Sequence, residues 1–237
     1  KRDYKIWSLA DSSTGCLLKF SIYQGKDEAR PKSLTLGEYV VTSLSKDCAP
    51  NSQIYFDNYF TSVKLLEILR EKQVFACGTF RTDRKYLPPE MKTDNKLKRG
   101  EYLWRGKESI CVIQWKDSKI FILCPISMIL QKVLKYKENF QMVQISLQCP
   151  QAIVDYNLRM NAVDKFDQKR NAYIVDRRSK KLWLRLFYFM LDAAIVSAFI
   201  QYSSESSMSY LTFRLLLGRQ LIAGQTSRRR KKQCFGI

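Results

Sequence analysis

The alternation of hydrophobic and polar residues near the start of the chain predicts two strands followed by a helix. Lys5–Leu9 and Leu17–Tyr23 are rich in β-forming residues, and the polar stretch between them ends in Gly15, so we expect an antiparallel hairpin. Leu36–Lys46 carries apolar side chains at helical spacing, with Thr35 as its candidate N-cap.

Residues 53 to 71 combine a strand, an acid and a helix. Gln53–Phe56 is short and mostly apolar, as expected of a buried strand, and Asp57 follows it directly. Thr61 and Ser62 are candidate caps for a helix at Val63–Glu71. Mixed α/β sheets often place functional side chains where a strand ends, so Asp57 is a candidate site residue. The alternative is that Asp57 only forms a turn.

Residues 74–149 show a different pattern, dominated by short β-forming runs, which predicts a β-rich insertion. Arg81–Arg99 contains two prolines and many basic residues without apolar periodicity, which predicts an exposed basic loop. The pattern of Pro125–Gln148 does not decide between helix and strand. The β-forming runs are Val74–Phe80, Gly100–Trp104, Ile110–Trp115 and Lys119–Cys124.

The last third of the chain is predicted to be helical. Gln151–Ala172 follows Pro150, and within it Asp164 and Asp167 are three residues apart, so they project from one helical face. Either a divalent cation or neighbouring Lys and Arg side chains can relieve their repulsion, and the sequence leaves both readings open. A further helix is expected at Tyr210–Ala223.

Leu182–Tyr202 is the longest apolar run and has about the length of a membrane span. Arg185 and Asp192 lie within it, and each would cost roughly 2.5–3.5 kcal/mol near the centre of a bilayer. We therefore expect a buried helix that packs on the sheet, and no membrane partner.

Charge and composition narrow the classes of function. The chain has 41 Lys and Arg against 22 Asp and Glu among 237 residues, a net charge of +19, so its surface should attract polyanions, nucleic acid above all. It contains no histidine, which excludes Ser-His-Asp, Cys-His and His-ligated metal chemistry within this chain. The seven cysteines are scattered without a CxxC pair, as expected of reduced thiols in an intracellular protein.

Basic residues concentrate in three segments, Arg81–Arg99, Arg177–Lys181 and Arg228–Lys232. These are candidates for phosphate contact, although such segments are often only solvated. In the first, Tyr86, Tyr102 and Trp104 are interleaved with the basic residues, and they are candidates for stacking on bases. The tail run Arg228–Lys232 is interpreted as a nuclear import signal or a phosphate arm, so we expect a nuclear protein. In the first two segments, the candidate nucleic-acid-binding residues are Arg81, Arg84, Lys85, Lys98, Arg99, Arg177, Arg178, Lys180 and Lys181.

Taken in order, these segments resemble the catalytic domain of piggyBac transposases and of the host proteins derived from them. No single segment is unique, but their order and spacing together are highly specific. The resemblance is carried by KIWSLADSSTG at Lys5–Gly15, LGEYVVTSLSK at Leu36–Lys46, FDNYFTS at Phe56–Ser62, DYNLRMNAVDKFDQ at Asp155–Gln168 and the basic-aromatic helix at Arg177–Tyr202.

The resemblance implies an α/β, RNase H-like mixed sheet with flanking helices, interrupted by a β-rich insertion. It also implies three aspartates that hold two Mg²⁺ ions, with Asp57 as the second, Asp164 as the third and Asp167 as a neighbouring acid of the same motif. Such ions activate the attacking oxygen and stabilise the leaving oxygen in phosphoryl transfer. The implied organisation is a first core part at 1–73, an insertion at 74–149, a helical core part at 150–202 and a C-terminal helix with a basic tail at 203–237.

Three departures from the family pattern bear on activity. The resemblance implies a first aspartate on a strand before the hairpin, and the chain begins at Lys1 without a methionine, as a piece of a longer protein does. Asn161 and Ala162 stand where the family usually has two glycines, and the cysteine-rich zinc module is absent. We therefore expect a domesticated DNA-binding domain whose strand transfer is doubtful, with a homodimer also considered. The alternatives are an active Mg²⁺-dependent transposase in the full-length protein, or a non-catalytic nuclear scaffold for RNA or chromatin.

Overall fold

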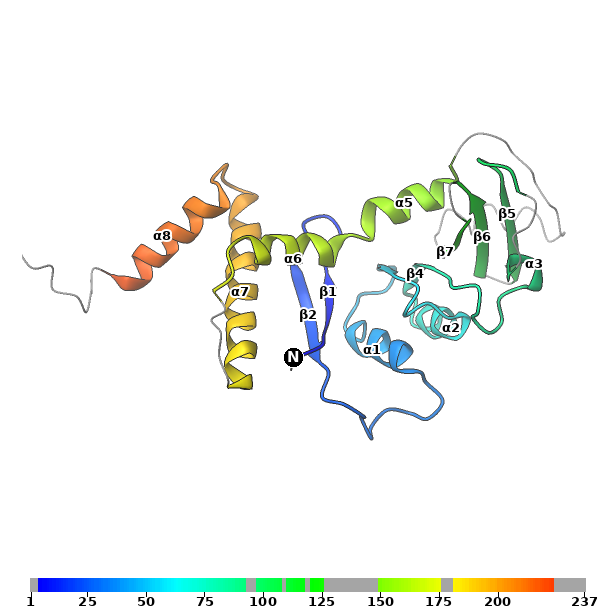
Figure 1. The fold of residues 1–237 in the computed structure, drawn as a ribbon, viewed down its shortest axis with the longest axis horizontal. Coiled ribbons are helices and arrows are strands. Elements are labelled where there is room, and N and C mark those ends of the chain that lie inside the picture. The colour runs from blue at the N-terminus through cyan, green and yellow to red at the C-terminus, as the bar shows by residue number, and fades with distance from the viewer. Residues whose placement is uncertain are drawn as a thin grey trace, which may run out of the picture. The chain divides into compact units, whose positions relative to one another are not determined.

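The computed structural model describes residues 4–92, 97–107, 110–117, 120–125, 149–175 and 181–223. The chain divides into two compact units, Lys1–Phe166 and Asp167–Ile237, and the boundary falls within one helix. Figure 1 follows the elements along the chain. The predicted segments at 1–73, 74–149, 150–202 and 203–237 are a different partition, and they stay a prediction.

The first unit opens with the predicted hairpin. Strands β1 (Ile6–Ala10) and β2 (Leu17–Ile22) pair antiparallel as a two-stranded sheet, with a register shift between Leu9 and Ala10. Gly15 closes the connecting turn with φ +74°, a conformation that L side chains rarely adopt.

A second, five-stranded sheet has the order β3-β4-β7-β6-β5. Its parallel pair joins β3 (Gln53–Phe56) to β4 (Phe75–Thr79), and all its other pairs are antiparallel. The strand from the predicted core and those from the predicted insertion therefore share one sheet. The remaining strands are β5 (Tyr102–Lys107), β6 (Ile110–Lys116) and β7 (Ile120–Pro125).

The mixed α/β class is confirmed, the five-stranded sheet is mixed, and the described strands form two small sheets. β1 pairs with β2 and β3 pairs with β4, and the two sheets have no ladder in common. An RNase H-like core stays a prediction.

Helices α1 (Leu36–Leu44) and α2 (Val63–Glu71) begin where the sequence predicts. Thr35 caps α1 in a complete capping box, and Ser62 caps α2 by accepting a hydrogen bond from the Leu65 amide. The apolar face of α2 is fully buried in a core with Ala76 of β4 and Val112 of β6.

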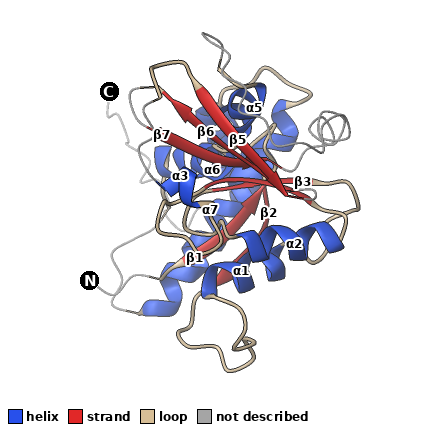
Figure 2. Ribbon diagram, turned by 90° about the vertical axis from the view of Figure 1, so that its right-hand side faces the viewer, coloured by secondary structure: helices blue, strands red, loops and turns tan. Residues whose placement is uncertain are grey.

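Helix α5 (Gln151–Arg159) packs in a separate core with alternate residues of the same strands. Ile153 and Tyr156 are buried beside Cys77 of β4 and Cys111 of β6. Because neighbouring residues of a strand point to opposite faces, α2 and α5 cover opposite faces of this sheet, as Figure 2 shows.

The basic segment after β4 is not the purely exposed loop that its composition predicts. It forms a short helix, α3 (Pro89–Lys92), and it buries Leu87 and Met91 almost completely in the α2 core. These two apolar residues are four positions apart, but the prolines and charges around them leave no clear apolar periodicity in the sequence. They hold the described part of the segment against the sheet.

The helix predicted at Gln151–Ala172 is in fact two helices. It breaks at Met160 and Asn161, and α6 (Ala162–Ala172) begins immediately afterwards. The Asn161 side chain donates a hydrogen bond to the Asn157 carbonyl at 3.5 Å, a local bond of the kind by which asparagine disfavours helix interiors.

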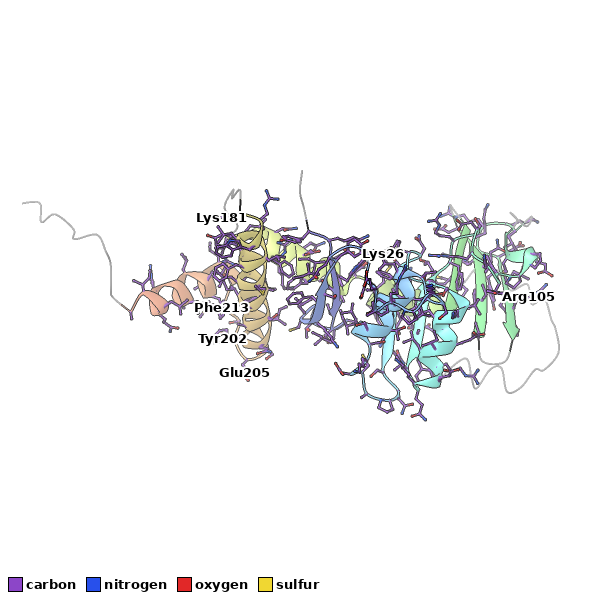
Figure 3. The ribbon with its side chains drawn as sticks, turned by 90° about the horizontal axis from the view of Figure 1, so that it is seen from below. Lys26, Arg105, Lys181, Tyr202, Glu205 and Phe213 are labelled. Carbon is purple, nitrogen blue, oxygen red and sulfur yellow. The ribbon has the colours of Figure 1, made fainter. Side chains whose placement is uncertain are left out.

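The second unit contains the end of α6, then α7 (Leu182–Ser203) and α8 (Tyr210–Ile222). Asp192 of α7 is buried, accepts hydrogen bonds from the Val175 amide at 3.2 Å, and lies 3.8 Å from Arg214 of α8. Tyr202 of α7 and Phe213 of α8 bring their rings to 5.5 Å (Figure 3). A charged pair and an aromatic contact therefore join the two helices.

The expectation that α7 is a buried core helix is only partly met. Ala193, Val196 and Ile200 form one buried stripe, whereas Trp183 and Phe187 are 60% and 47% exposed. By length and composition, Trp183–Ser203 is also apolar enough to cross a membrane, which is weak evidence because core helices pass the same test. The absence of a membrane partner stays a prediction.

Gly78 in β4 provides a test of how tightly the sheet meets the turn after β3. A Cβ at this position would overlap Thr61 Oγ1 and the Phe56 ring, so we expect Gly78→Ala to lower the free energy of unfolding by about 1–3 kcal/mol. Gly218 lies inside α8 with open space around it, so Gly218→Ala should raise that free energy by about 0.5–1 kcal/mol. Urea denaturation of both variants measures the contrast, and equal effects would contradict it.

Candidate functional site

Asp57 lies at the surface in the turn that joins β3 to α2. Its Oδ1 accepts a hydrogen bond from the Tyr59 amide at 2.9 Å, and its carbonyl accepts one from the buried Thr61 hydroxyl at 2.8 Å. Asp57 therefore does stabilise a turn, as the alternative interpretation of the sequence predicts. It leaves the second carboxylate oxygen of Asp57 without a hydrogen bond among the described residues, so a role in binding is compatible with the turn.

The backbone just before Asp57 is held from the α5 side of the sheet. The buried Tyr156 hydroxyl donates a hydrogen bond to the Phe56 carbonyl at 3.2 Å. Burial raises the pKa of Tyr156, and the nearby Asp57 charge is among the smaller causes that add to this rise. A residue one hundred positions away therefore fixes the end of β3.

Glu38 of α1 holds the other end of the turn. Its carboxylate accepts hydrogen bonds from the Thr35 amide at 2.7 Å and from the Ser62 hydroxyl at 2.6 Å. Burial alone would raise the pKa of Glu38, but these hydrogen bonds, with Lys64 nearby, bring it below its ordinary value. One buried carboxylate thus connects the caps of α1 and α2.

An aromatic cluster connects the hairpin to the same turn. Trp7 of β1 stacks on Tyr59 with ring centroids at 5.6 Å, and Phe60 meets both rings edge-on. The Lys5 ammonium lies 4.1 Å from the Trp7 ring centroid. The cluster therefore holds β1 against the turn that carries Asp57.

Asp11 is a candidate residue that the sequence analysis missed. It directly follows β1, as Asp57 directly follows β3. Its Oδ2 accepts hydrogen bonds from the Ser13 and Thr14 hydroxyls and from the Thr14 amide, and these lower its pKa to about 2. The strand-then-acid pattern was visible in the sequence, but the polar run after it predicts an ordinary turn.

The hairpin turn that begins at Asp11 packs on the first turn of α6, which carries Asp164. A Cβ added at Gly15 would lie 3.0 Å from Lys165 Cβ and 3.4 Å from the Ala162 carbonyl oxygen. Asp164 itself is exposed, and Asp167 lies 3.4 Å from Arg170 in the second unit. The structure therefore brings the Asp11 turn to the helix of Asp164.

Proximity of Asp57 to Asp164 stays a prediction. Across the described parts of the chain, no three Asp, Glu or Cys side chains are grouped closely enough to hold a metal ion. The present arrangement does not fit a metal centre, and we assign no reaction step to one.

The predicted basic contacts differ in how available they are. Lys85 and Lys98 are exposed, whereas Arg81 pairs with Asp83 at 3.0 Å and Arg99 with Asp117 at 2.9 Å. Of the candidates around residue 180, only Lys181 belongs to the described residues, and it is exposed (Figure 3). Arg177, Arg178, Lys180 and the run at 228–232 lie outside them.

The expected stacking residues also differ. Tyr86 is 81% exposed, whereas Tyr102 and Trp104 pack partly buried against the core around Cys77 and Cys111, and their role in stacking on bases stays a prediction. Because β5 needs these rings to cover its inner face, they serve the fold first.

Comparison with known proteins identifies the class. A family model described as "Transposase IS4" matches residues 1–199. The chain therefore belongs to this transposase family.

The similarities lie with its piggyBac members. The chain is 32% identical over 209 residues to human PiggyBac transposable element-derived protein 2, covering 82% of this chain and 35% of that protein. It is 24% identical to human PiggyBac transposable element-derived protein 5, covering 94% of this chain and 44% of that protein. The chain thus spans less than half the length of these relatives.

The fold is shared with a solved structure. The cryo-EM structure of a piggyBac transposase synaptic complex with hairpin DNA matches with a TM-score of 0.79 at 24% identity, over 92% of this chain and 46% of that chain. The resemblance stated from sequence motifs is confirmed, and the chain is a piggyBac-related, transposase-derived domain.

Acid sensitivity tests the role of Asp11. Its pKa is lowered from 3.8 to about 2 in the folded protein, so between these values the unfolded chain binds more protons and stability falls as pH falls. In Asp11→Asn this contribution is absent, so the fall in urea midpoint from pH 6 to pH 3 should be smaller than in the wild type. Because Asp11 is only partly buried, the difference will be modest. An identical fall in both proteins would contradict the role of Asp11 in stabilising the folded state.

Proposed function

We propose that this chain is a domesticated piggyBac-type domain that binds DNA through its basic surface and acts in the nucleus. The observation that carries the proposal is the fold shared with a transposase whose solved structure is a complex with hairpin DNA, in a chain with a net charge of +19. A chain of this charge attracts a polyanion at neutral pH. The fold match supports DNA as this polyanion.

Several basic residues of the first unit support this interface. Lys85 and Lys98 are exposed, and the segment that carries Lys85 is anchored in the core through Leu87 and Met91. An anchored segment presents its charges with less loss of backbone entropy on binding than a free loop does. A homodimer is compatible with the proposal.

DNA affinity should fall steeply with salt. If about four phosphates are contacted, the affinity should drop roughly 10²-fold between about 50 and 200 mM salt, because released counterions supply most of such binding. Lys85→Ala and Lys98→Ala should each make the slope of log affinity against log salt shallower by about 0.9. Lys26→Ala, which removes an exposed charge from the loop after β2, should leave that slope unchanged (Figure 3).

Fluorescence anisotropy with a labelled duplex at several salt concentrations measures these slopes. No binding at low salt, or a flat salt response, would overturn the proposed DNA interface. Tighter binding to RNA than to DNA of equal length would favour the scaffold alternative.

Metal-dependent strand cleavage is the second candidate function, and the placement of Asp11 favours it. If Asp11, Asp57 and Asp164 come together when DNA or metal binds, they supply three carboxylates of the kind that hard cations prefer. The contact between the Asp11 turn and the first turn of α6 supports such an approach.

Thermal denaturation with and without divalent cations tests this candidate. Millimolar Mg²⁺ or Mn²⁺ should raise the melting temperature, and both Asp11→Asn and Asp57→Asn should abolish the rise. The exposed Asp83→Asn is the matched control and should retain it. No metal effect in the wild type would leave DNA binding without catalysis as the function.

A further inference from the structure

Arg84 reaches from the basic segment back to the turn that carries Asp57. One of its terminal nitrogens, Nη2, donates hydrogen bonds to the carbonyls of Asn58 and Tyr59, at 2.9 and 2.6 Å. These carbonyls are 26 and 25 positions away in the sequence. The guanidinium therefore binds the backbone directly after the candidate acid.

A second nitrogen of the Arg84 side chain is also kept from solvent. Its Nε is buried and has no hydrogen-bond partner among the described residues. Bidentate recognition of a phosphate needs two neighbouring N–H groups of the guanidinium fork. With Nε enclosed and Nη2 bound to two carbonyls, Arg84 does not present that edge of the fork to DNA. Lys85, the next residue, is exposed instead.

Helix α1 also packs closely against the same stretch of backbone. A Cβ added at Gly37 would lie 3.2 Å from the Tyr59 carbonyl oxygen and 3.4 Å from Phe60 Cα, and the neighbouring Glu38 binds the Ser62 hydroxyl. The Tyr59 carbonyl thus meets α1 and Arg84 together. Contacts from two distant elements restrain the turn, and so the Asp57 carboxylate, more than the turn's own hydrogen bonds alone would.

We infer that Arg84 is a positioning residue: it fixes the Asp57–Tyr59 backbone and so the Asp57 carboxylate beside the DNA, while its neighbour Lys85 contacts phosphate. This inference rests on the proposed function only in taking DNA as the ligand. It replaces the sequence-based assignment of Arg84 as a DNA contact. The basic segment and the acidic turn then form one unit, because a single side chain ties them together.

Hydrogen exchange followed by mass spectrometry tests the tether without any ligand. Arg84→Met keeps the length and the apolar stem but removes the donors, so amides of residues 57–61 should exchange at least several-fold faster, while those of β5 and β6 keep their rates. Lys85→Met is the matched control and should change neither region. Arg84→Lys, whose ammonium can still donate to one of the carbonyls, should give an intermediate rate.

DNA binding separates positioning from phosphate contact. Arg84→Met should keep the wild-type salt slope, whereas Lys85→Met should make it shallower by about 0.9. Asp57→Asn should strengthen DNA binding by removing a negative charge, and this gain should shrink in the Arg84→Met background, where the carboxylate is no longer held in place. A role in overall stability alone would leave the two substitutions additive.

Each outcome decides a different point. Unchanged exchange at residues 57–61 in Arg84→Met, or a salt slope reduced as much as by Lys85→Met, would overturn the positioning role while the DNA-binding function stands. Absence of DNA binding in the wild type would overturn the proposed function, and the exchange experiment would still decide whether Arg84 holds the turn.

Discussion

The turn between β3 and α2 is where the first unit is most strongly constrained. Glu38 satisfies the caps of two helices at once, and Tyr156 holds the strand end from the other face of the sheet. Buried polar groups of this kind stabilise a fold only when each one finds its partner. The position of Asp57 therefore depends on the whole unit, because the residues next to it contact α1, α5, β1 and the segment that carries Arg84.

This constraint explains how a chain with a net charge of +19 can keep an acid in an ordered turn. Arg84 places positive charge on the carbonyls after Asp57, and the apolar residues Leu87 and Met91 anchor the segment that supplies it. Hydrophobic burial supplies the anchoring, and the hydrogen bonds supply the direction. The predicted insertion is consequently continuous with the core: its strands extend the same sheet, and its basic segment returns to the site.

Membership of the transposase family does not decide activity. The described acids do not gather into a metal-binding group, and Asp11 and Asp57 each use a carboxylate oxygen to order their own turn. A residue that forms a turn can also bind a ligand if its second oxygen is free to do so. The proposed DNA binding and the proposed metal-dependent cleavage are therefore separable, since the two proposals assign them to different side chains.

The sequence by itself determined the class, the family, the hairpin, the capped helices and the strand that ends at Asp57, because these depend on local periodicity, caps and a specific order of motifs. The break at Met160 and Asn161, the burial of Leu87 and Met91, the two separate sheets and the partial exposure of α7 were decided only by the tertiary structure. So were the partners of Glu38 and Arg84. These features depend on which distant residues meet, and two hydrogen-bonding groups 25 positions apart leave no periodic trace in a sequence.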